Sequence, residues 1–165
     1  MRYFIFLFFL CFELIAQGQI IVKETDGKQT FPLVSSNNKT LISYDENDFE
    51  VVKEAAHLFV EDIRSVTGKK LTLSGKQKTS AYMVIIGTVG QNRTIDRFVS
   101  EGKLDISPIH NGWEQYIIQT LDNPDKNIRK ALVIAGCDRR GTAYGVFALS
   151  EVMGVDPLYW WADVP

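Results

Sequence analysis

Cysteine and histidine are both scarce in this chain, which contains two of each in 165 residues. Cys11 lies in an apolar N-terminal run that has the layout of a secretion leader, so we expect Cys137 to be the only cysteine of the processed chain. A single cysteine excludes an internal disulfide framework. His57 and His110 have no ligand-like spacing to each other or to Cys137. We therefore expect neither a disulfide nor a metal site.

The chain also lacks a strong charge of either sign. It has 18 Lys and Arg residues against 20 Asp and Glu residues, which gives a formal net charge of −2 at pH 7. Nucleic-acid-binding domains usually carry a basic patch or stripe, and the sequence has none. We therefore expect no nucleic-acid partner.

No apolar run is long enough for a comfortable membrane span. The run Tyr3–Phe12 falls well short of the ~20 residues that a transmembrane helix requires. It follows the short basic segment Met1–Arg2 and precedes the small residues Ala16 and Gly18, which is the layout of a secretory signal peptide. We predict that residues 1–18 are removed and that the protein is exported, to the periplasm or the extracellular space, without a membrane-spanning segment.

Hydrophobic periodicity predicts one domain over residues 19–157, in which strands alternate with helices. Strand patterns cover 19–24, 31–34, 41–44, 71–73, 83–87, 114–121 and 131–135, and helical patterns cover 49–68, 94–101 and 142–153. The runs 19–24 and 31–34 resemble a hairpin, residues 45–48 offer helix N-caps, and 123–125 is typical of a turn. The expected fold is α+β (an α/β sandwich), with a mixed β-sheet and two long helices packed on it.

The last predicted helix is the most apolar. It begins at Thr142, and its expected inward face is Tyr144, Phe147, Ala148 and Val152, with further apolar residues widening that face. Such a helix should be buried on most sides. Gly145, in its middle, costs about 1 kcal/mol relative to alanine. We therefore expect the helix backbone to approach the sheet or a neighbouring domain closely at Gly145.

A polar turn before this helix holds the first candidate site residues. Gly136 and Gly141 have the offset of a phosphate-binding loop, but Thr142 stands where that loop requires lysine, so we expect no nucleotide or other cofactor. Asp138 is a candidate helix cap. Arg139 and Arg140 either belong to a structural ion-pair network or meet a ligand carboxylate or an acidic partner surface.

The aromatic end of the sequence holds the second group of candidates. Trp160 and Trp161 either anchor an interface or stack on a sugar ring, and Asp163 comes shortly after them. Large apolar side chains are unusual at a surface terminus. We therefore expect that more protein continues beyond Pro165 and that 158–165 is the start of a linker.

Several segments of the chain together resemble the N-terminal domain of glycoside hydrolase family 115. They are Ala135–Gly145, Leu149–Glu151, Gly154–Val155 and Tyr159–Pro165, with weaker likeness back through the helix at 49–68. Family members are xylan α-1,2-glucuronidases that remove glucuronic or 4-O-methyl-glucuronic acid by inversion. Cys137, Asp156 and Leu158 depart from the Ser, Ser and Trp that the resemblance leads one to expect.

The resemblance implies a domain similar to the second domain of β-hexosaminidases, with a catalytic (β/α)8 barrel after it. No catalytic residue of that barrel has a counterpart here, so none is assigned. The implied partners are the downstream barrel of the same chain and glucuronoxylan, and the family permits a homodimer. The leading hypothesis is a supporting domain that is inactive alone. The alternative is a stand-alone exported carbohydrate-binding or interaction module.

Overall fold

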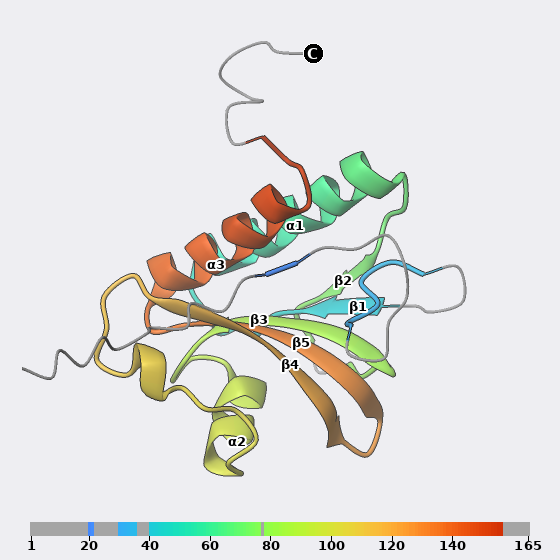
Figure 1. The fold of residues 1–165 in the computed structure, drawn as a ribbon. Coiled ribbons are helices and arrows are strands. Elements are labelled where there is room, and N and C mark those ends of the chain that lie inside the picture. The colour runs from blue at the N-terminus through green and yellow to red at the C-terminus, as the bar shows by residue number, and fades with distance from the viewer. Residues whose placement is uncertain (1–19, 22–29, 36–39, 77, 157–165) are drawn as a thin grey trace, which may run out of the picture.

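The computed structural model describes residues 20–21, 30–35, 40–76 and 78–156. A five-stranded mixed sheet lies between helices, with α1 and α3 on one face and α2 on the other (Figure 1). The elements are β1 (Thr40–Ser43), α1 (Glu50–Thr67), β2 (Thr72–Ser74), β3 (Tyr82–Thr88), α2 (Arg93–Ser100), the 3-10 turn η1 (Ser107–Ile109), β4 (Tyr116–Asp125), β5 (Ile128–Gly136) and α3 (Arg139–Val152). The predicted α+β class, with two long helices on a mixed sheet, is confirmed.

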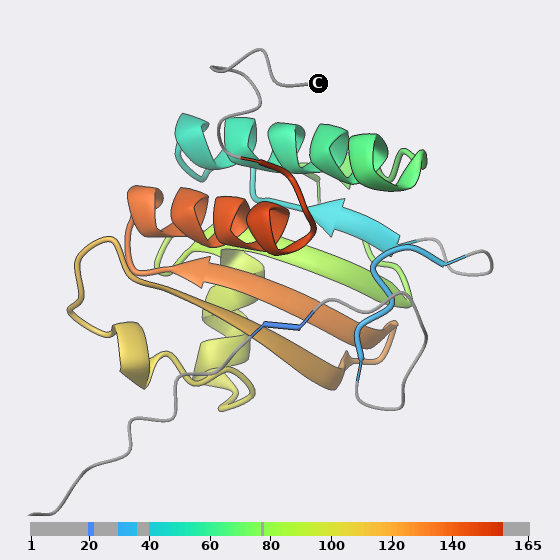
Figure 2. The same ribbon diagram turned by 45° about the horizontal axis from the view of Figure 1, so that its top comes forward.

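The strand order is β2-β1-β3-β5-β4, and all neighbours are parallel except β4 and β5, which form an antiparallel hairpin. Six of the seven residues of β3 are buried, because helices cover both faces of the sheet at this central position. The parallel strands end at one edge of the sheet. Helices α1 and α3 begin at that same edge and run side by side (Figure 2).

The α1/α3 face holds the larger of two cores. Fully buried Phe59 and Ile63 of α1 meet Val146 of α3 and Ile134 of β5 in this cluster. Gly145 of α3 faces the sheet, and a Cβ there would lie 2.9 Å from Ile134 Cγ2 and 3.0 Å from ring atoms of Tyr116. The predicted close approach of the helix backbone to the sheet at Gly145 is confirmed.

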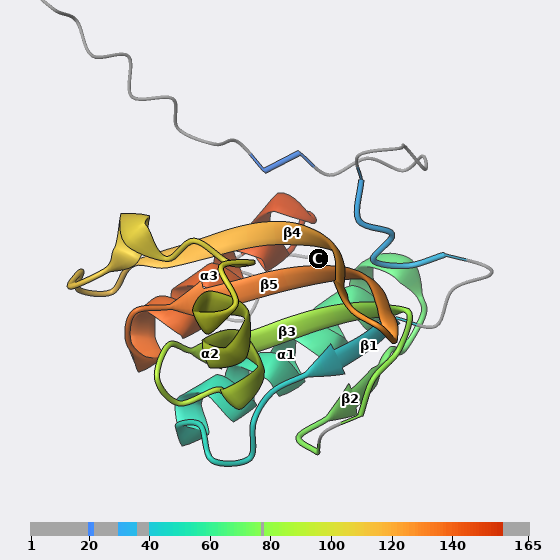
Figure 3. The ribbon, with the colours of Figure 1, turned by 90° about the horizontal axis from the view of Figure 1, so that it is seen from below.

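The second core lies under α2, which crosses the opposite face of the sheet (Figure 3). Ile95 and Phe98 of α2 are fully buried against Ile85 of β3 and Val133 of β5. Asn92 caps this helix, because its side-chain oxygen accepts hydrogen bonds from the backbone N–H groups of Thr94 (3.1 Å) and Ile95 (3.2 Å). No helix within the described ranges is both long and apolar enough to cross a bilayer.

The predicted start and orientation of α3 were wrong. The helix begins at Arg139 rather than Thr142, because Asp138 caps it. Tyr144, Phe147 and Val152 were expected to point inward, yet each is at least 40% exposed. The buried residues of the helix are Gly141, Thr142, Ala143, Gly145, Val146, Leu149 and Ser150, and of these Val146 and Leu149 are among the apolar residues that were expected to widen the inward face. Small residues such as Ala143 and Gly145 bring α3 close to the sheet, whereas Tyr144, Phe147 and Val152 lie on the outer surface.

Other differences concern strand and helix ends. Residues 31–34 form no strand, and 22–29 lie outside the described residues. The predicted turn at 123–125 lies inside β4, where the register shifts and Asn123 adopts a φ of 49°. The N-cap of α1 is Phe49, without a side-chain cap, rather than a residue of 45–48. Its end at Gly68, in the left-handed conformation (φ 69°), matches the prediction.

Candidate functional site at the carboxyl edge of the sheet

A hollow of about 300 Å³ lies at the edge where β3 and β5 end. Its walls come from the ends of these strands and from the starts of α1 and α3, and they consist of Phe49, Thr88, Val89, Gln91, Cys137, Asp138 and Arg139. Crevices outside the carboxyl ends of parallel strands are the usual ligand sites of α/β folds. This edge is therefore the first candidate for a functional site.

Asp138 organises the start of α3. Its Oδ1 accepts hydrogen bonds from the backbone N–H groups of Arg140 (2.9 Å) and Gly141 (2.7 Å), and its Oδ2 accepts one from Glu114 N (2.8 Å). Burial acts to raise the pKa of this carboxyl group, but the hydrogen bonds from Gly141, Glu114 and Arg140 outweigh it and lower the pKa. Asp138 is therefore an ionised helix cap that also ties α3 to the loop before β4.

Arg140 belongs to a local ion-pair network. Its guanidinium lies 2.8 Å from Glu114 Oε1 and donates a hydrogen bond to the Tyr144 hydroxyl at 3.1 Å. The hydrogen bond to Tyr144 and the charge of Glu114 raise the pKa of Arg140. The sequence left open whether Arg140 belongs to a structural ion-pair network or meets an external acidic group, and its contacts in the structure are those of an ion-pair network.

Arg139 has different surroundings. Its guanidinium carbon lies 5.9 Å from the centre of the Phe49 ring, and it forms no ion pair within the described part of the chain. Both side chains line the hollow. A cation above an aromatic ring is attracted to it, and a guanidinium also binds carboxylates well. Arg139 is therefore the residue of this edge that is best placed to meet an anionic group from outside.

Next to the hollow lies a buried polar layer formed by Asp48, Thr88 and Thr142. Asp48 is only 4% exposed, and its carboxylate accepts hydrogen bonds from Thr88 N and Phe49 N, both at 2.8 Å. The hydroxyl groups of Thr88 and Thr142 lie 3.0 Å apart, which joins β3 to α3. Burial raises the pKa of Asp48, although these hydrogen bonds act in the opposite direction. The layer fixes the starts of both long helices to the end of β3.

A second buried carboxylate lies beside it. Asp45 is 6% exposed and pairs with Arg93, whose Nε lies 2.8 Å from Oδ2. Burial acts to raise the pKa of Asp45. The hydrogen bonds from Arg93 and Asn47 outweigh this effect, so the pKa is lowered. This pair connects the end of β1 to the start of α2. Its charges are matched within the protein.

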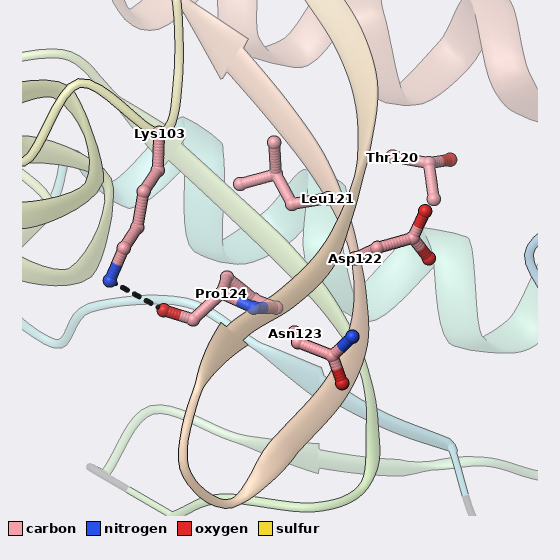
Figure 4. A pocket seen from close by; sticks show the side chains of 6 residues that line it. All are labelled: Lys103, Thr120, Leu121, Asp122, Asn123 and Pro124. Atoms are coloured by element: carbon pink, nitrogen blue, oxygen red, sulfur yellow. Dashed lines mark hydrogen bonds between the residues drawn. The ribbon is translucent and has the colours of Figure 1, made fainter.

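Another hollow, of about 320 Å³, lies on β4 at the register shift (Figure 4). Lys103 and Asp122 are the charged residues of its wall. Lys103 Nζ donates to the carbonyl oxygen of Pro124 at 2.8 Å, and Asp122 pairs with Lys130 at 3.3 Å. Both charges are therefore engaged with the protein, which makes this hollow the weaker candidate.

The structure brings together three of the six predicted site residues. Asp138, Arg139 and Arg140 lie at the start of α3, whereas Trp160, Trp161 and Asp163 lie outside the described residues. Sequence reasoning missed the layer of Asp48, Thr88 and Thr142, because the contacts join residues 40 and 54 positions apart. It also missed an exposed tryptophan at position 113. Within the described ranges, no cluster of His, Cys, Asp and Glu could hold a metal ion.

Comparison with solved structures relates this fold to a glycoside hydrolase. The chain is similar to part of BtGH115A, a family GH115 4-O-methyl-α-glucuronidase described as specific for decorated arabinogalactans, with 27% identity and a TM-score of 0.62. The match covers 79% of this chain and 15% of that protein. The chain is thus similar to one domain of a family 115 glucuronidase and spans a small part of its length.

The other comparisons are less informative. The chain matches a structure titled CpGH84D with a TM-score of 0.48 and 14% identity, over 72% of this chain and 18% of the other. No protein-family model matches the sequence. No curated protein matches it either.

Proposed function

We propose that this chain is the non-catalytic N-terminal domain of an exported family 115 glucuronidase, and that it is inactive without the catalytic domain. The similarity to BtGH115A over 79% of the chain carries the proposal. The matched region is 15% of that enzyme, which leaves room for a separate catalytic domain and supports the non-catalytic role. The substrate is a polysaccharide that carries glucuronic or 4-O-methyl-glucuronic acid, with glucuronoxylan as the first choice and inversion as the stereochemical course.

The carboxylates at the carboxyl edge support a structural role. A glycosidase needs one carboxyl group as an acid and a second as a base or nucleophile, both facing the substrate. Here Asp45 is paired with Arg93, Asp48 accepts two backbone hydrogen bonds, and Asp138 caps α3. Each carboxylate is therefore occupied in holding the fold.

The exposed side chains on the outer face of α1 and α3 support the proposal of a partner domain. Six large apolar side chains on these helices are 40–48% exposed: Val51, Leu58, Val66, Tyr144, Phe147 and Val152. We call this set the outer helix face. The last described residues, 153–156, follow the end of α3 beside this face (Figure 1). We assign the catalytic domain as its occupant, because exposed apolar surface favours packing against a neighbouring domain.

The test is release of glucuronic acid from glucuronoxylan and from arabinogalactan. The 165-residue chain should release none, and the chain joined to the catalytic domain encoded downstream should be active. Activity of the short chain would mean that it contains its own acid and base, which would overturn the non-catalytic role. Inactivity of both proteins on both substrates would overturn the assignment to a glucuronidase.

A second candidate is a stand-alone carbohydrate-binding module, and one observation favours it: the chain exposes an unstacked tryptophan at position 113. This candidate predicts polysaccharide binding by the chain alone, whether or not a catalytic domain exists.

A further inference from the structure

Trp113 is the most exposed large apolar residue of the described chain, with 77% of its surface accessible. It lies in the loop between η1 and β4. A tryptophan normally buries most of its large surface, so an indole this exposed is a candidate contact for a ligand. The ring forms no aromatic pair within the described residues. Both faces of this indole are thus free of other rings.

The backbone of the loop is held in place on both sides of Trp113. Asn111 and Glu114 both adopt left-handed conformations, with φ of 60° and 56°. Such conformations are costly for residues other than glycine, and they persist only where surrounding contacts impose them. The neighbouring Gly112 donates its N–H to the carbonyl oxygen of Ile109 at 3.1 Å. The exposed ring is therefore presented by an imposed backbone conformation.

Contacts to α3 supply the restraint. Glu114 N donates to the carboxylate of Asp138 at 2.8 Å, and Gln115 N donates to Cys137 Sγ at 3.3 Å. In return, Cys137 N donates to the carbonyl oxygen of Gln115 at 2.9 Å. A Cβ on Gly141 would collide with that same carbonyl group, so glycine is required for the approach. The loop is thus fixed to the start of α3.

Trp113 is followed in the chain by Glu114, which belongs to a polar cluster at the start of α3. Glu114 and Arg140 pair at 2.8 Å, so their charges cancel, and Arg140 also binds the Tyr144 hydroxyl. Tyr116 and Tyr144 are 36% and 40% exposed, and the Tyr116 ring packs on α3 at Gly145. We call Trp113, Glu114, Tyr116, Arg140 and Tyr144 the aromatic corner.

We propose that the aromatic corner binds a neutral pyranose unit of a polysaccharide backbone, with the Trp113 indole stacked on the apolar face of the sugar. A pyranose ring presents C–H groups on its face and hydroxyl groups around its rim. Because the loop backbone is already held in place, less conformational freedom is lost on binding, and the phenol, carboxylate and guanidinium groups of the aromatic corner offer hydrogen bonds to the rim. A uronic acid would instead have to compete with Glu114 for Arg140.

The identification of the ligand as a polysaccharide rests on the proposed function, whereas the neutral stacking site rests on the aromatic corner. On the outer helix face, by comparison, the six exposed side chains are spread along two helices, and none is a tryptophan. The two surfaces therefore have different occupants: a protein domain on the outer helix face and a sugar chain on the aromatic corner.

The test measures binding by the purified chain, independently of glucuronidase activity. Affinity electrophoresis through gels that contain xylan or arabinogalactan should retard the chain, and calorimetry with neutral xylo-oligosaccharides should give an affinity. Trp113→Ala should weaken it about tenfold or more, which corresponds to a loss of about 1.4 kcal/mol or more. Trp113→Phe should recover part of the loss, and Ile21→Ala, which changes an exposed apolar residue outside both surfaces, should leave the affinity unchanged.

Several outcomes would overturn the proposal. One is that the chain binds neither polysaccharide, and another is that Trp113→Ala binds as well as the unaltered chain. A third is that the Trp160→Ala/Trp161→Ala variant loses binding while Trp113→Ala does not, which would move the sugar to the end of the sequence. A fourth is that free glucuronate displaces the polysaccharide more effectively than neutral xylobiose. A failed glucuronidase assay on the extended protein would not affect any of these results.

Discussion

The two faces of the sheet are covered by helices of different kinds. Helix α2 buries Ile95 and Phe98 and has no large exposed apolar side chain among its residues, so its outer surface is suited to water. Helices α1 and α3 bury a larger core, yet they keep six large apolar side chains on the outside. A helix that is apolar on both sides is normally buried on both. The outer surface of α2 is therefore suited to solvent, whereas the outer surface of α1 and α3 is suited to contact with a partner.

The largest expected effects test whether both cores are equally well packed. Phe59 on α1 and Phe98 on α2 are both fully buried. Replacing either with alanine should lower the free energy of unfolding by about 3–5 kcal/mol, because the transfer energy of the ring is lost and a cavity remains. Urea unfolding would measure both. A cost below about 1 kcal/mol for Phe59→Ala alone would mean that the α1/α3 core closes properly only when the partner is present.

Much of this architecture could be predicted from the sequence. The pattern located β3 because it is a continuous apolar run, and it located α1 and α2 because each buries a regular stripe of apolar residues. The orientation of α3 could not be predicted in this way, since both of its sides carry apolar residues and the choice depends on fit. Gly145 and Ala143 allow the helix to lie close to the sheet, and Tyr144 and Phe147 would not. The orientation of α3 is therefore determined by how closely its backbone can pack against the sheet, which the apolar pattern of the sequence does not record.

The candidate site was less predictable than the fold. Asp138 was expected as a cap because an aspartate before a helix is a local signal. The contact of Asp48 with Thr88, or of Glu114 with Arg140, depends on which strands become neighbours, and no local pattern records that. Trp113 gave no signal because a tryptophan in a loop looks the same whether the fold buries it or exposes it.

Gly145→Ala should have the next largest effect. An added Cβ would lie 2.9 Å from Ile134 Cγ2 and 3.0 Å from the Tyr116 ring, and both groups belong to the sheet. The gain in helix propensity is about 1 kcal/mol, whereas overpacking costs about 1–3 kcal/mol, so we expect net destabilisation. Thermal unfolding would measure it, with Ser65→Ala on the exposed side of α1 as the control for propensity. A Gly145→Ala protein as stable as the parent would refute the close contact.

The helix caps of the two faces should differ in their response to pH. Asp138→Ala and Asn92→Ala should each cost about 0.5–2 kcal/mol at neutral pH. Asp138 has a lowered pKa in the folded protein, so its contribution is present above the ordinary value of 3.8 and is lost as the pH falls through the lower folded value. Asn92 does not titrate. Urea unfolding at about pH 7 and about pH 3 should therefore show a shrinking cost for Asp138→Ala and a constant one for Asn92→Ala.

The smallest effect on stability is expected on the outer helix face, and it bears most directly on the difference between the two faces. Leu58→Lys and Phe147→Lys change side chains that are 45% and 43% exposed. Each should alter the free energy of unfolding of the chain alone by no more than about 0.5 kcal/mol, since little buried contact is lost. The same changes should weaken association with the catalytic domain, because a charge would be buried in an apolar contact. Ser100→Lys, an exposed change on α2, is the control, and it should affect neither property. If association were equally sensitive on α2, or insensitive on α1 and α3, the assignment of the partner to the outer helix face would be wrong.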